Sequence, residues 1–476
     1  MKPRPSNRAS RERRRLGGEP RCDAPASTPA GRRRSQSGSV LILVLWISIG
    51  LVAIALYFAQ AMTYELRASD NRASGFAADQ TIEGAARYVS FVLENFATNG
   101  AVPLQSQYAS EAVPVGDARF WLIGRDPAGM PSSDPYFGLV DEASKLSLNR
   151  AGTNVLSYLP DMTLDFAYAI ADWRNTNASG FYSLDYNSLG YEDKSYPFET
   201  VDELRLVYGA SMDLLVGEDV NRNGVLDANE KDLNGNGALD PGLFEYVTVY
   251  SRQPNFHADG TMLTNVNDQA QLRNLLQTTF GSSRATQIMT RLGFGGGGGG
   301  GAAPNYRNLL RFFSASGLNS SEYTQIAYGI TDTTNRYTNG LLNINTASAT
   351  VMTALFMGLG VDQSTATAAA QQLVTYRQQN PNNLTAITWI VDALGNNSPV
   401  VQSLEGAGRD YITTQSFQFT ADIAAVGPYG RGYRRVKFVF DTSEGAPKVI
   451  YRQDLSRLGW ALGENARETW VARQTP

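Results

Sequence analysis

The sequence predicts a mixed α+β fold, in which a long N-terminal helix packs on a small antiparallel sheet and a large, mainly helical domain is inserted. Three observations predict it. Helical periodicity continues beyond an apolar segment that begins at residue 39, two strand-like runs follow, and three more lie near the C-terminus. Because strands flank a helical stretch, one sheet built from both ends of the chain is the economical arrangement.

Charge divides the chain at Gly38. Residues 1–38 hold eleven Arg and Lys and three acidic residues, about +8, so the whole-chain charge of −4 leaves about −12 for residues 39–476. Residues 39–64 carry no charge. About 20 apolar residues span a hydrocarbon core, and basic flanks stay cytoplasmic. We therefore predict a single-pass anchor with the body of the protein outside the cytoplasm.

Helical periodicity continues from residue 65 to Gly100, with apolar residues such as Ile82, Ala85 and Val89 spaced three and four apart. With the apolar segment this predicts one helix of about 60 residues, about 90 Å long. The alternative is a plain anchor followed by a separate helix, with a break at Gly75 or Gly84.

Five strand-like runs follow the alternation of apolar and polar residues. Runs 118–124 and 136–142 predict an antiparallel pair, and runs 416–425, 433–441 and 448–455 predict a three-stranded meander. Between them, residues 348–379 predict two helices joined by a glycine turn, a packing or docking module. The seven glycines from Gly295 to Gly301 predict a flexible loop tip. The alternative, a nucleotide-binding loop, is disfavoured because the Lys and Ser/Thr of a phosphate-binding loop are missing.

Composition argues against several classes of protein. The single cysteine, Cys22, lies in the basic leader and the single histidine, His257, lies in a polar stretch, so zinc chemistry is poorly supported. A net charge near −12 on residues 39–476 disfavours binding to nucleic acid, because it would repel the phosphate groups. An anchored hydrolase is a further alternative, but no nucleophile with a plausible base is apparent. The sequence predicts a protein that is not an enzyme.

A calcium loop is predicted at residues 219–230. Its ligand positions 1, 3, 5, 7, 9 and 12 are all filled, with a glycine at position 6, Gly224. The predicted ligands are Asp219, Asn221, Asn223, the Val225 carbonyl, Asp227 and Glu230. The alternative is an acidic turn that holds no ion.

A second loop repeats this pattern thirteen residues later, with Asp232, Asn234, Asn236 and Asp240. Position 12 is Leu243, and the nearest carboxylate is Glu245. One residue separates the loops, so the long helices of a paired EF-hand do not fit between them. We therefore expect Ca²⁺ bound in a static loop, without a calcium-triggered opening.

Several phrases share an order and spacing that resemble one family, the minor pseudopilin K (general secretion pathway protein K) of the type II secretion system. These phrases are the apolar run after the basic leader (38–50), DEASKLSLNRA (141–151), PFETVDELRLVYG (197–209), VTVYSR (247–252) and LLNINTASATVMTALF (341–356).

The resemblance implies a pilin-like domain on a long N-terminal helix, interrupted by a helical insert, at the tip of a periplasmic pseudopilus that this subunit caps and initiates. It implies these segments: a basic leader (1–38), the membrane-spanning half of the helix (39–64), the first part of the pilin-like domain (65–148), the inserted domain (149–412) with calcium-type loops (219–245) and a glycine-rich loop (293–303), and the C-terminal strands and tail (413–476).

The resemblance also implies processing and partners. A prepilin peptidase would cut after Gly38 and methylate Ser39. The family usually has a large apolar residue at this first mature position, so Ser39 is a departure from its pattern. The expected partners are the other minor pseudopilins, the major pseudopilin and the inner membrane, with the body in the periplasm. Most pilin-like subunits carry Glu at the fifth mature position, where this chain has Leu43, which suits a tip subunit. The alternative function is a calcium-dependent adhesin or minor pilin of another type IV filament.

Overall fold

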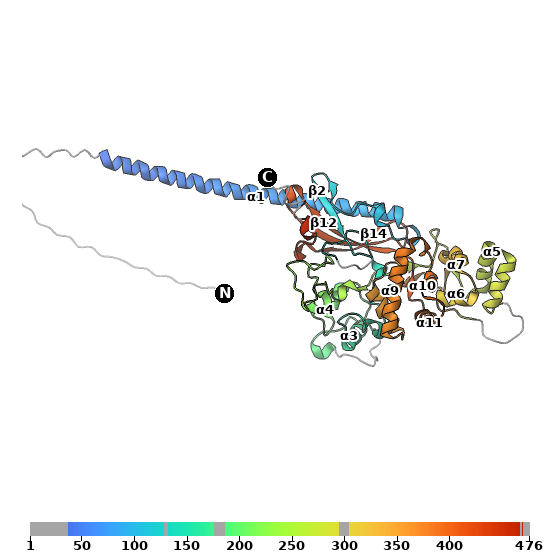
Figure 1. The fold of residues 1–476 in the computed structure, drawn as a ribbon. Helices are drawn as coiled ribbons and strands as arrows, with labels where there is room; N and C mark the ends of the chain where they lie inside the picture. The colour runs from blue at the N-terminus through green and yellow to red at the C-terminus, as the bar shows by residue number, and fades with distance from the viewer. Residues whose placement is uncertain (1–36, 128–131, 176–185, 295–303, 467–468, 470–476) are drawn as a thin grey trace, which may run out of the picture. The chain divides into compact units, whose positions relative to one another are not determined.

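The computed structural model describes residues 37–127, 132–175, 186–294, 304–466 and 469 (Figure 1). The basic leader up to residue 36 and the glycine run 295–301 lie outside these ranges. The chain divides into two compact units, Met1–Arg67 and Ala68–Pro476.

The N-terminal helix α1 (Ser37–Phe96) is continuous over 60 residues, which confirms one helix rather than two. Neither Gly75 nor Gly84 interrupts it. Among the described residues, one helix is long and apolar enough to cross a membrane, Val40–Phe96, and its most apolar window is not buried. In the unit that ends at Arg67, the large apolar side chains from Val40 to Phe58 are all exposed.

A six-stranded antiparallel sheet forms the first part of the second unit, with strand order β1-β2-β12-β13-β14 and with β3 also paired to β12. Its strands are β1 (Val113–Val115), β2 (Ala118–Ile123), β3 (Val140–Asp141), β12 (Gln418–Val426), β13 (Arg434–Asp441) and β14 (Lys448–Asp454). The predicted C-terminal meander is confirmed, because β12 pairs with β13 and β13 with β14.

The predicted antiparallel pairing of the two early runs is confirmed over a short stretch, at the bridge Ile123↔Phe137, where Gly124 N donates to the Tyr136 carbonyl at 2.8 Å and Gly138 N to the Leu122 carbonyl at 2.7 Å. Most of their pairing is with a third strand, which was not predicted. β2 pairs with Asp422–Val426 and β3 pairs with Phe419 and Thr420, so the two strands lie one after the other along β12. The nine-residue β12 is long enough for two short partners, which alternation within each run does not reveal.

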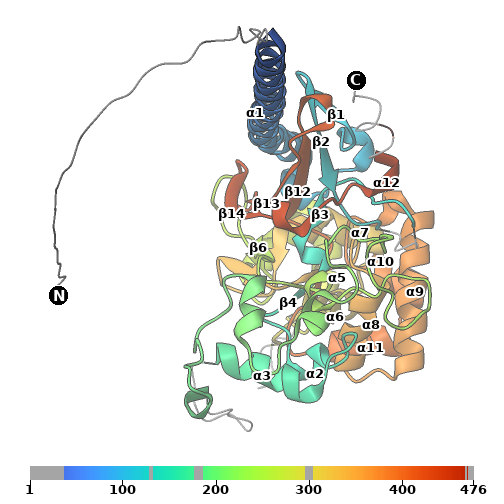
Figure 2. The same cartoon turned by 90° about the vertical axis from the view of Figure 1, so that its left-hand side faces the viewer.

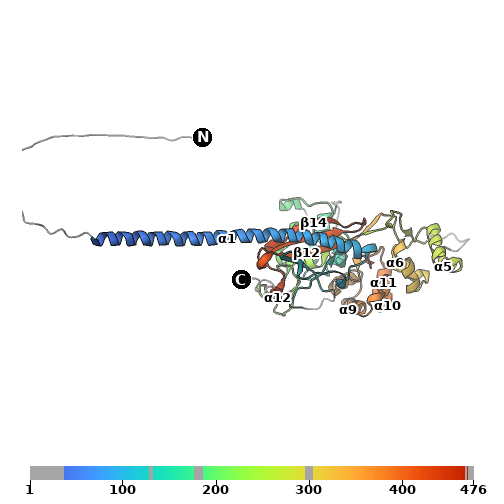
Figure 3. The same ribbon diagram turned by 90° about the horizontal axis from the view of Figure 1, so that it is seen from above.

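The C-terminal half of α1 covers one face of this sheet (Figures 1 and 3). Its buried residues recur every three or four positions, which places them on one side of the helix. They pack against the apolar residues of one face of the central strands. The helix contributes Ala78, Ile82, Ala85, Ala86, Val89 and Leu93, and the sheet contributes Phe120, Leu122, Phe419, Ala421, Ile423, Ala425, Val436, Phe438 and Phe440.

The opposite face of the sheet is polar where it meets the rest of the unit. Because side chains alternate along a strand, Thr420 and Asp422 of β12 and Arg435 and Lys437 of β13 share that face. All nine residues of β12 are buried. The central strand is therefore covered on both sides, by α1 and by the segments that follow β3.

Helices dominate the segment between β3 and β12 (Figure 2). They are α2 (Thr153–Leu156), α3 (Leu164–Arg174), α4 (Met212–Val216), α5 (Gln269–Arg291), α6 (Leu309–Ser316), α7 (Ser320–Ile326), α8 (Ala349–Gly358), α9 (Gln363–Gln379), α10 (Trp389–Leu394) and α11 (Pro399–Gly406), with α12 (Gly463–Ala466) after the sheet. Their core is a separate cluster whose members all lie between Leu146 and Ile412.

The predicted helix pair at 348–379 is confirmed as α8 and α9. The Ser348 hydroxyl accepts from Val351 N and the Asp362 carboxylate accepts from Thr365 N, so a side chain caps each helix. Four two-stranded pairs tie the loops together: β4 (Leu146–Ser147) with β5 (Val247–Thr248), β6 (Arg252–Pro254) with β9 (Tyr337–Asn339), β7 (Thr264–Asn265) with β8 (Ile330–Thr331), and β10 (Leu342–Asn343) with β11 (Ile412–Thr413).

Candidate functional site

The loop at residues 219–230 folds inward around its predicted ligand residues. Both oxygens of Asp219 accept backbone N–H groups, from Asn223 at 2.8 Å and from Gly224 at 2.9 Å. Gly224 has φ +86°, a left-handed conformation that glycine adopts without steric cost. The chain therefore turns back on itself at the sixth position of the loop, as a calcium loop requires.

The side chains of the third, fifth and ninth positions converge. The amide groups of Asn221 and Asn223 both donate to Asp227 Oδ2, the second at 2.9 Å. A half-turn about the Cβ–Cγ bond of each Asn would exchange its nitrogen and oxygen, and would present two oxygens beside the carboxylate. Glu230 closes the loop by accepting from Asn221 N at 3.0 Å and from Asp227 N at 3.1 Å.

Burial makes the first loop sensitive to charge. Asp219 and Asn221 are each 3 % exposed, and Asn223 is fully buried. Burial raises the pKa of Asp219, against the lowering effect of the nearby Arg125, and burial also raises the pKa of Glu230. A bound cation would oppose both shifts, because it stabilises the ionised carboxylates.

The donor set fits a calcium ion if amide and carbonyl oxygens take part. Within the described residues, no three His, Cys, Asp or Glu side chains form a group that could hold a metal. A cation here would therefore need the oxygens of Asn221 and Asn223 and the carbonyl of Val225 besides the carboxylates, and such oxygen ligands suit Ca²⁺.

The second loop repeats the hydrogen-bonding pattern of the first. Asp232 accepts from Gly235 N at 2.6 Å and from Gly237 N at 2.8 Å, and these and other backbone N–H groups lower its pKa. The amides of Asn234 and Asn236 donate to Asp240 Oδ2 at 2.6 and 2.9 Å. Asn234 and Asn236 are exposed, unlike their counterparts in the first loop.

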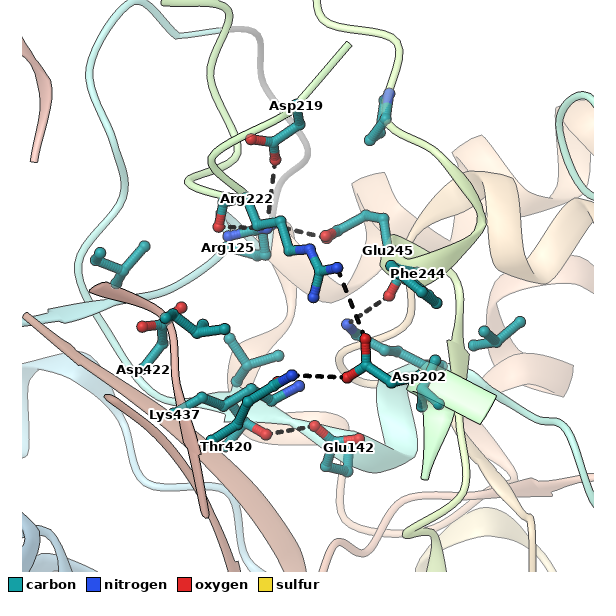
Figure 4. A pocket seen from close by; sticks show the side chains of 18 of the residues that line it. Arg125, Glu142, Asp202, Asp219, Arg222, Phe244, Glu245, Thr420, Asp422 and Lys437 are labelled. Atoms are coloured by element: carbon teal, nitrogen blue, oxygen red, sulfur yellow. Dashed lines mark hydrogen bonds and ion pairs between the residues drawn. The ribbon is translucent and has the colours of Figure 1, made fainter. Parts of the chain in front are cut away.

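Glu245, predicted as a ligand of the second loop, forms an ion pair with Arg125. Its carboxylate accepts from Arg125 Nε at 2.8 Å instead, and Arg125 in turn lies 3.6 Å from Asp219 (Figure 4). The 3₁₀ turn Leu243–Glu245 places this side chain toward β2 and the sheet. The carboxylate that contacts the second loop is Glu218, the residue before the first loop, which accepts from Asp240 N at 3.0 Å.

Arg435 fastens the first loop to the sheet. Its side chain on β13 has no exposed surface, and it donates to the Arg222 carbonyl at 2.8 Å and to the Asn221 carbonyl. The same guanidinium holds Asp422 on β12. The backbone of the loop is therefore bonded to the two central strands, a contact that sequence reasoning missed because arginines in strands are usually exposed.

A cavity of about 80 Å³ lies between the loop and the polar face of the sheet (Figure 4). Glu142 accepts from the hydroxyls of Thr248 and Thr420 there. Burial would raise the pKa of Glu142, yet the ammonium groups of Lys437 and Lys145 leave it below its ordinary value. Opposite charges thus neutralise one another around the cavity. No motif in the sequence predicted this arrangement.

The predicted processing residues lie in α1. The backbone of Gly38 and Ser39 is helical, and Leu43 is 62 % exposed within the apolar segment. His257, in its polar stretch, is exposed.

No protein-family model matches this chain, and no curated protein matches it.

Proposed function

We propose that this protein is a minor pseudopilin of the type II secretion system, which caps the tip of the periplasmic pseudopilus and initiates its assembly. The observation that carries the proposal is α1. One unbroken helix begins with an exposed, charge-free apolar segment and continues into residues that pack on an antiparallel sheet. An ordinary anchor needs no such continuity, whereas a pilin-like subunit uses one helix both for membrane storage and for assembly.

The segment from Val40 to Phe58 supports an assembly role. Its apolar side chains are exposed, so they are available to lipid and then to the helices of neighbouring subunits. Leu43 gives the proposed position in the filament, since it offers no carboxylate to the N-terminal ammonium of a subunit above it. The helical insert would add bulk that blocks further growth.

Calcium has a structural role in this proposal. The loop 219–230 would bind one Ca²⁺ and would keep the backbone that Arg435 holds against β12 and β13 in one conformation. The ion would thereby stiffen the contact between the insert and the sheet. Periplasmic exposure would supply the ion without a signalling change in its concentration.

Leader processing tests the proposal. The full chain is produced in a host with an active prepilin peptidase, and the intact mass of membrane-extracted protein is measured. We expect a chain that begins at Ser39 and carries one added methyl group. A host that lacks the peptidase is the control, and there the leader should remain.

An uncut chain in the host with the peptidase would contradict the proposal. Assembly separates it from the alternative filament: co-isolation with the other pseudopilins supports the secretion system, whereas display on the cell surface supports an adhesin.

A further inference from the structure

Three arginines of the helical insert, Arg150, Arg174 and Arg409, have no acidic partner. Arg150 follows β4, Arg174 is the last residue of α3, and Arg409 lies between α11 and β11. Among the described residues, none of the three forms an ion pair or donates a hydrogen bond to a carboxylate. Elsewhere in the insert and the sheet, arginines such as Arg284 and Arg435 pair with Glu or Asp. The cluster of three is therefore unusual within this acidic chain.

Main-chain carbonyls hold the three guanidinium groups near one another. Arg409 Nη2 donates to the Arg150 carbonyl at 3.0 Å, and Arg174 Nη2 donates to the next carbonyl, that of Ala151, at 2.6 Å. The Arg150 side chain donates to two carbonyls of other segments, at 2.9 and 2.5 Å. Because the Arg150 and Ala151 carbonyls are consecutive, the side chains of Arg174 and Arg409 approach the same short stretch of backbone.

These carbonyls satisfy a minority of the donors in the cluster. Each guanidinium carries five N–H donors, and the described part of the chain gives Arg174 and Arg409 one acceptor each and Arg150 two. Two of the remaining nitrogen atoms, Arg150 Nε and Arg174 Nη1, are buried and have no acceptor among the described residues. A buried donor without an acceptor is unfavourable. The cluster therefore lacks acceptors as well as negative charge.

The positive charges of the cluster repel one another. Burial and then the charge of Arg409 lower the pKa of Arg174 to about 10, and the same two causes lower the pKa of Arg150. The nearby carboxyl groups compensate little. Burial and then the Asp332 charge raise the pKa of Asp410 to about 8, and Arg150 contacts its main-chain carbonyl. Burial likewise raises the pKa of Asp332, which forms no ion pair within the described chain.

A solitary arginine, Arg377, shows how carbonyls alone can stabilise this side chain. Arg377 is 5 % exposed and donates to the carbonyls of Pro127, Ile344 and Ala347 at 2.6 to 3.1 Å. No buried nitrogen of Arg377 lacks an acceptor in the described structure. The three clustered arginines differ from it in two ways, because they have fewer acceptors and because they lie beside like charges. A purely structural role explains Arg377 but leaves the cluster unsatisfied.

We infer that Arg150, Arg174 and Arg409 bind a small oxyanion of the phosphate class. The planar forks of arginine match the oxygens of phosphate, and such charge-assisted hydrogen bonds are strong. All three side chains are partly exposed, so a small ion can reach them from solvent. Phosphate brings four oxygens and up to two negative charges to three guanidinium groups, whereas a carboxylate brings two oxygens and one charge. The inference is independent of both the secretion role and calcium binding.

Titration calorimetry with inorganic phosphate tests the inference on the detergent-solubilised full chain, in a phosphate-free buffer at neutral pH. The parent should bind one phosphate ion saturably. Arg174→Gln and Arg409→Gln each remove one charged fork, so each should weaken the affinity at least about tenfold. The matched control is Arg87→Gln on α1, where the arginine is exposed and lies outside the cluster, and it should bind phosphate like the parent.

Arg409→Glu separates binding from folding. It places a carboxylate beside Arg150 and Arg174, so it should abolish phosphate binding. In phosphate-free buffer its midpoint of thermal unfolding should exceed that of Arg409→Gln, because the new carboxylate supplies the missing negative charge. A parent without saturable binding, or Gln variants with the parent's affinity, would overturn the inference. So would chloride that raises the parent's unfolding midpoint as much as phosphate does at equal ionic strength.

Discussion

Arg435 on β13 and Asp422 on β12 form a bidentate ion pair, with Nε to Oδ1 at 2.8 Å and Nη2 to Oδ2 at 2.6 Å. The guanidinium is fully buried and also holds the backbone of the first calcium-type loop. Burial would lower the pKa of Arg435, but the Asp422 charge and its hydrogen bonds raise the pKa above the ordinary value. The pair joins sheet and insert through one side chain.

Arg435→Met should lower the free energy of unfolding by about 3 to 5 kcal/mol, because it leaves Asp422 buried without its partner. Chemical denaturation of the solubilised protein measures this. The matched control is Arg452→Met on β14, where Arg452 and Glu83 are 55 % and 53 % exposed and lie 3.4 Å apart. That exposed pair should be worth about 0 to 1 kcal/mol. Equal losses for the two variants would contradict the role given to Arg435.

Ile82→Ala should lower the free energy of unfolding by about 2 to 5 kcal/mol through the cavity it leaves between α1 and the sheet. Ile82 is 1 % exposed, whereas Phe91 on the same helix is 60 % exposed. Phe91→Ala should therefore change stability by no more than about 0.5 kcal/mol. Thermal unfolding of both variants compares them, and a larger loss for Phe91→Ala would place the buried face of α1 elsewhere.

Excess chelator should lower the midpoint of thermal unfolding. At a free concentration of 100 times Kd, one bound ion adds about 2.7 kcal/mol to the stability of the folded state. Glu230→Gln should reduce the shift that the chelator causes, and Asp117→Asn should leave it at the parent value. An identical midpoint with and without chelator would count against an occupied, stabilising site.

The buried carboxyl pair in the insert should make stability fall with rising pH. Asp410 and Asp332 line a cavity of about 40 Å³. Burial and then the Asp332 charge raise the pKa of Asp410 to about 8, and burial raises that of Asp332. The native state then keeps a proton that the unfolded chain releases above about pH 4, so this contribution is complete below pH 4 and is lost as the pH rises to about 8.

Asp410→Asn should remove the loss of stability with rising pH, because the amide does not ionise. The amide oxygen can still accept from Leu309 N, as the Asp410 carboxyl does at 2.8 Å. We expect the variant to raise the unfolding midpoint relative to the parent, and more at pH 8 than at pH 5. Thermal unfolding across this range measures the difference. A gain that does not depend on pH would mean that Asp410 is ionised in the native protein.

Leu43→Glu should alter assembly if Leu43 restricts the subunit to the tip. A carboxylate at this position could neutralise the N-terminus of a subunit above, so the variant should be incorporated below the tip and secretion should fall. The matched control is Leu45→Glu. It carries a similar insertion cost, about 2.5 to 3.5 kcal/mol at the bilayer centre, but its carboxylate is not at the fifth mature position. Secretion and filament assembly equal to the parent in Leu43→Glu would refute the account of this residue.

Local patterns predicted the elements whose residues determine them. The periodicity of α1, the alternation in β12, β13 and β14 and the capped pair α8 and α9 all lie within short windows of sequence. The ligand register of the first loop is equally local, and its side chains do converge. Pairings between distant residues were not predictable in this way, because nothing near β3 indicates that its partner is Phe419 of β12.

The two carboxylates Glu245 and Glu218 illustrate this limit at the candidate site. Distance along the sequence from position 12 favoured Glu245, but the 3₁₀ turn directs it to Arg125. The strand-like pairing of Gly217 with Pro241 brings Glu218 to the second loop from 22 residues before Asp240. The only sequence sign of this pairing was the presence of glycine at 217 and 242. A side chain at either position would clash with the backbone of the other segment, which is apparent only in the folded structure.

The place of β12 in the sheet imposes an order on biogenesis. Its partners β2 and β3 are complete by Asp141, but the strand that joins them begins at Gln418. During synthesis the apolar face of α1, with Ile82 and Val89, therefore stays uncovered until β12 has been made. Chains that stop short of β12 lack the strand that joins β2 to β3, so their sheet cannot close and the apolar face of α1 stays open to proteolysis.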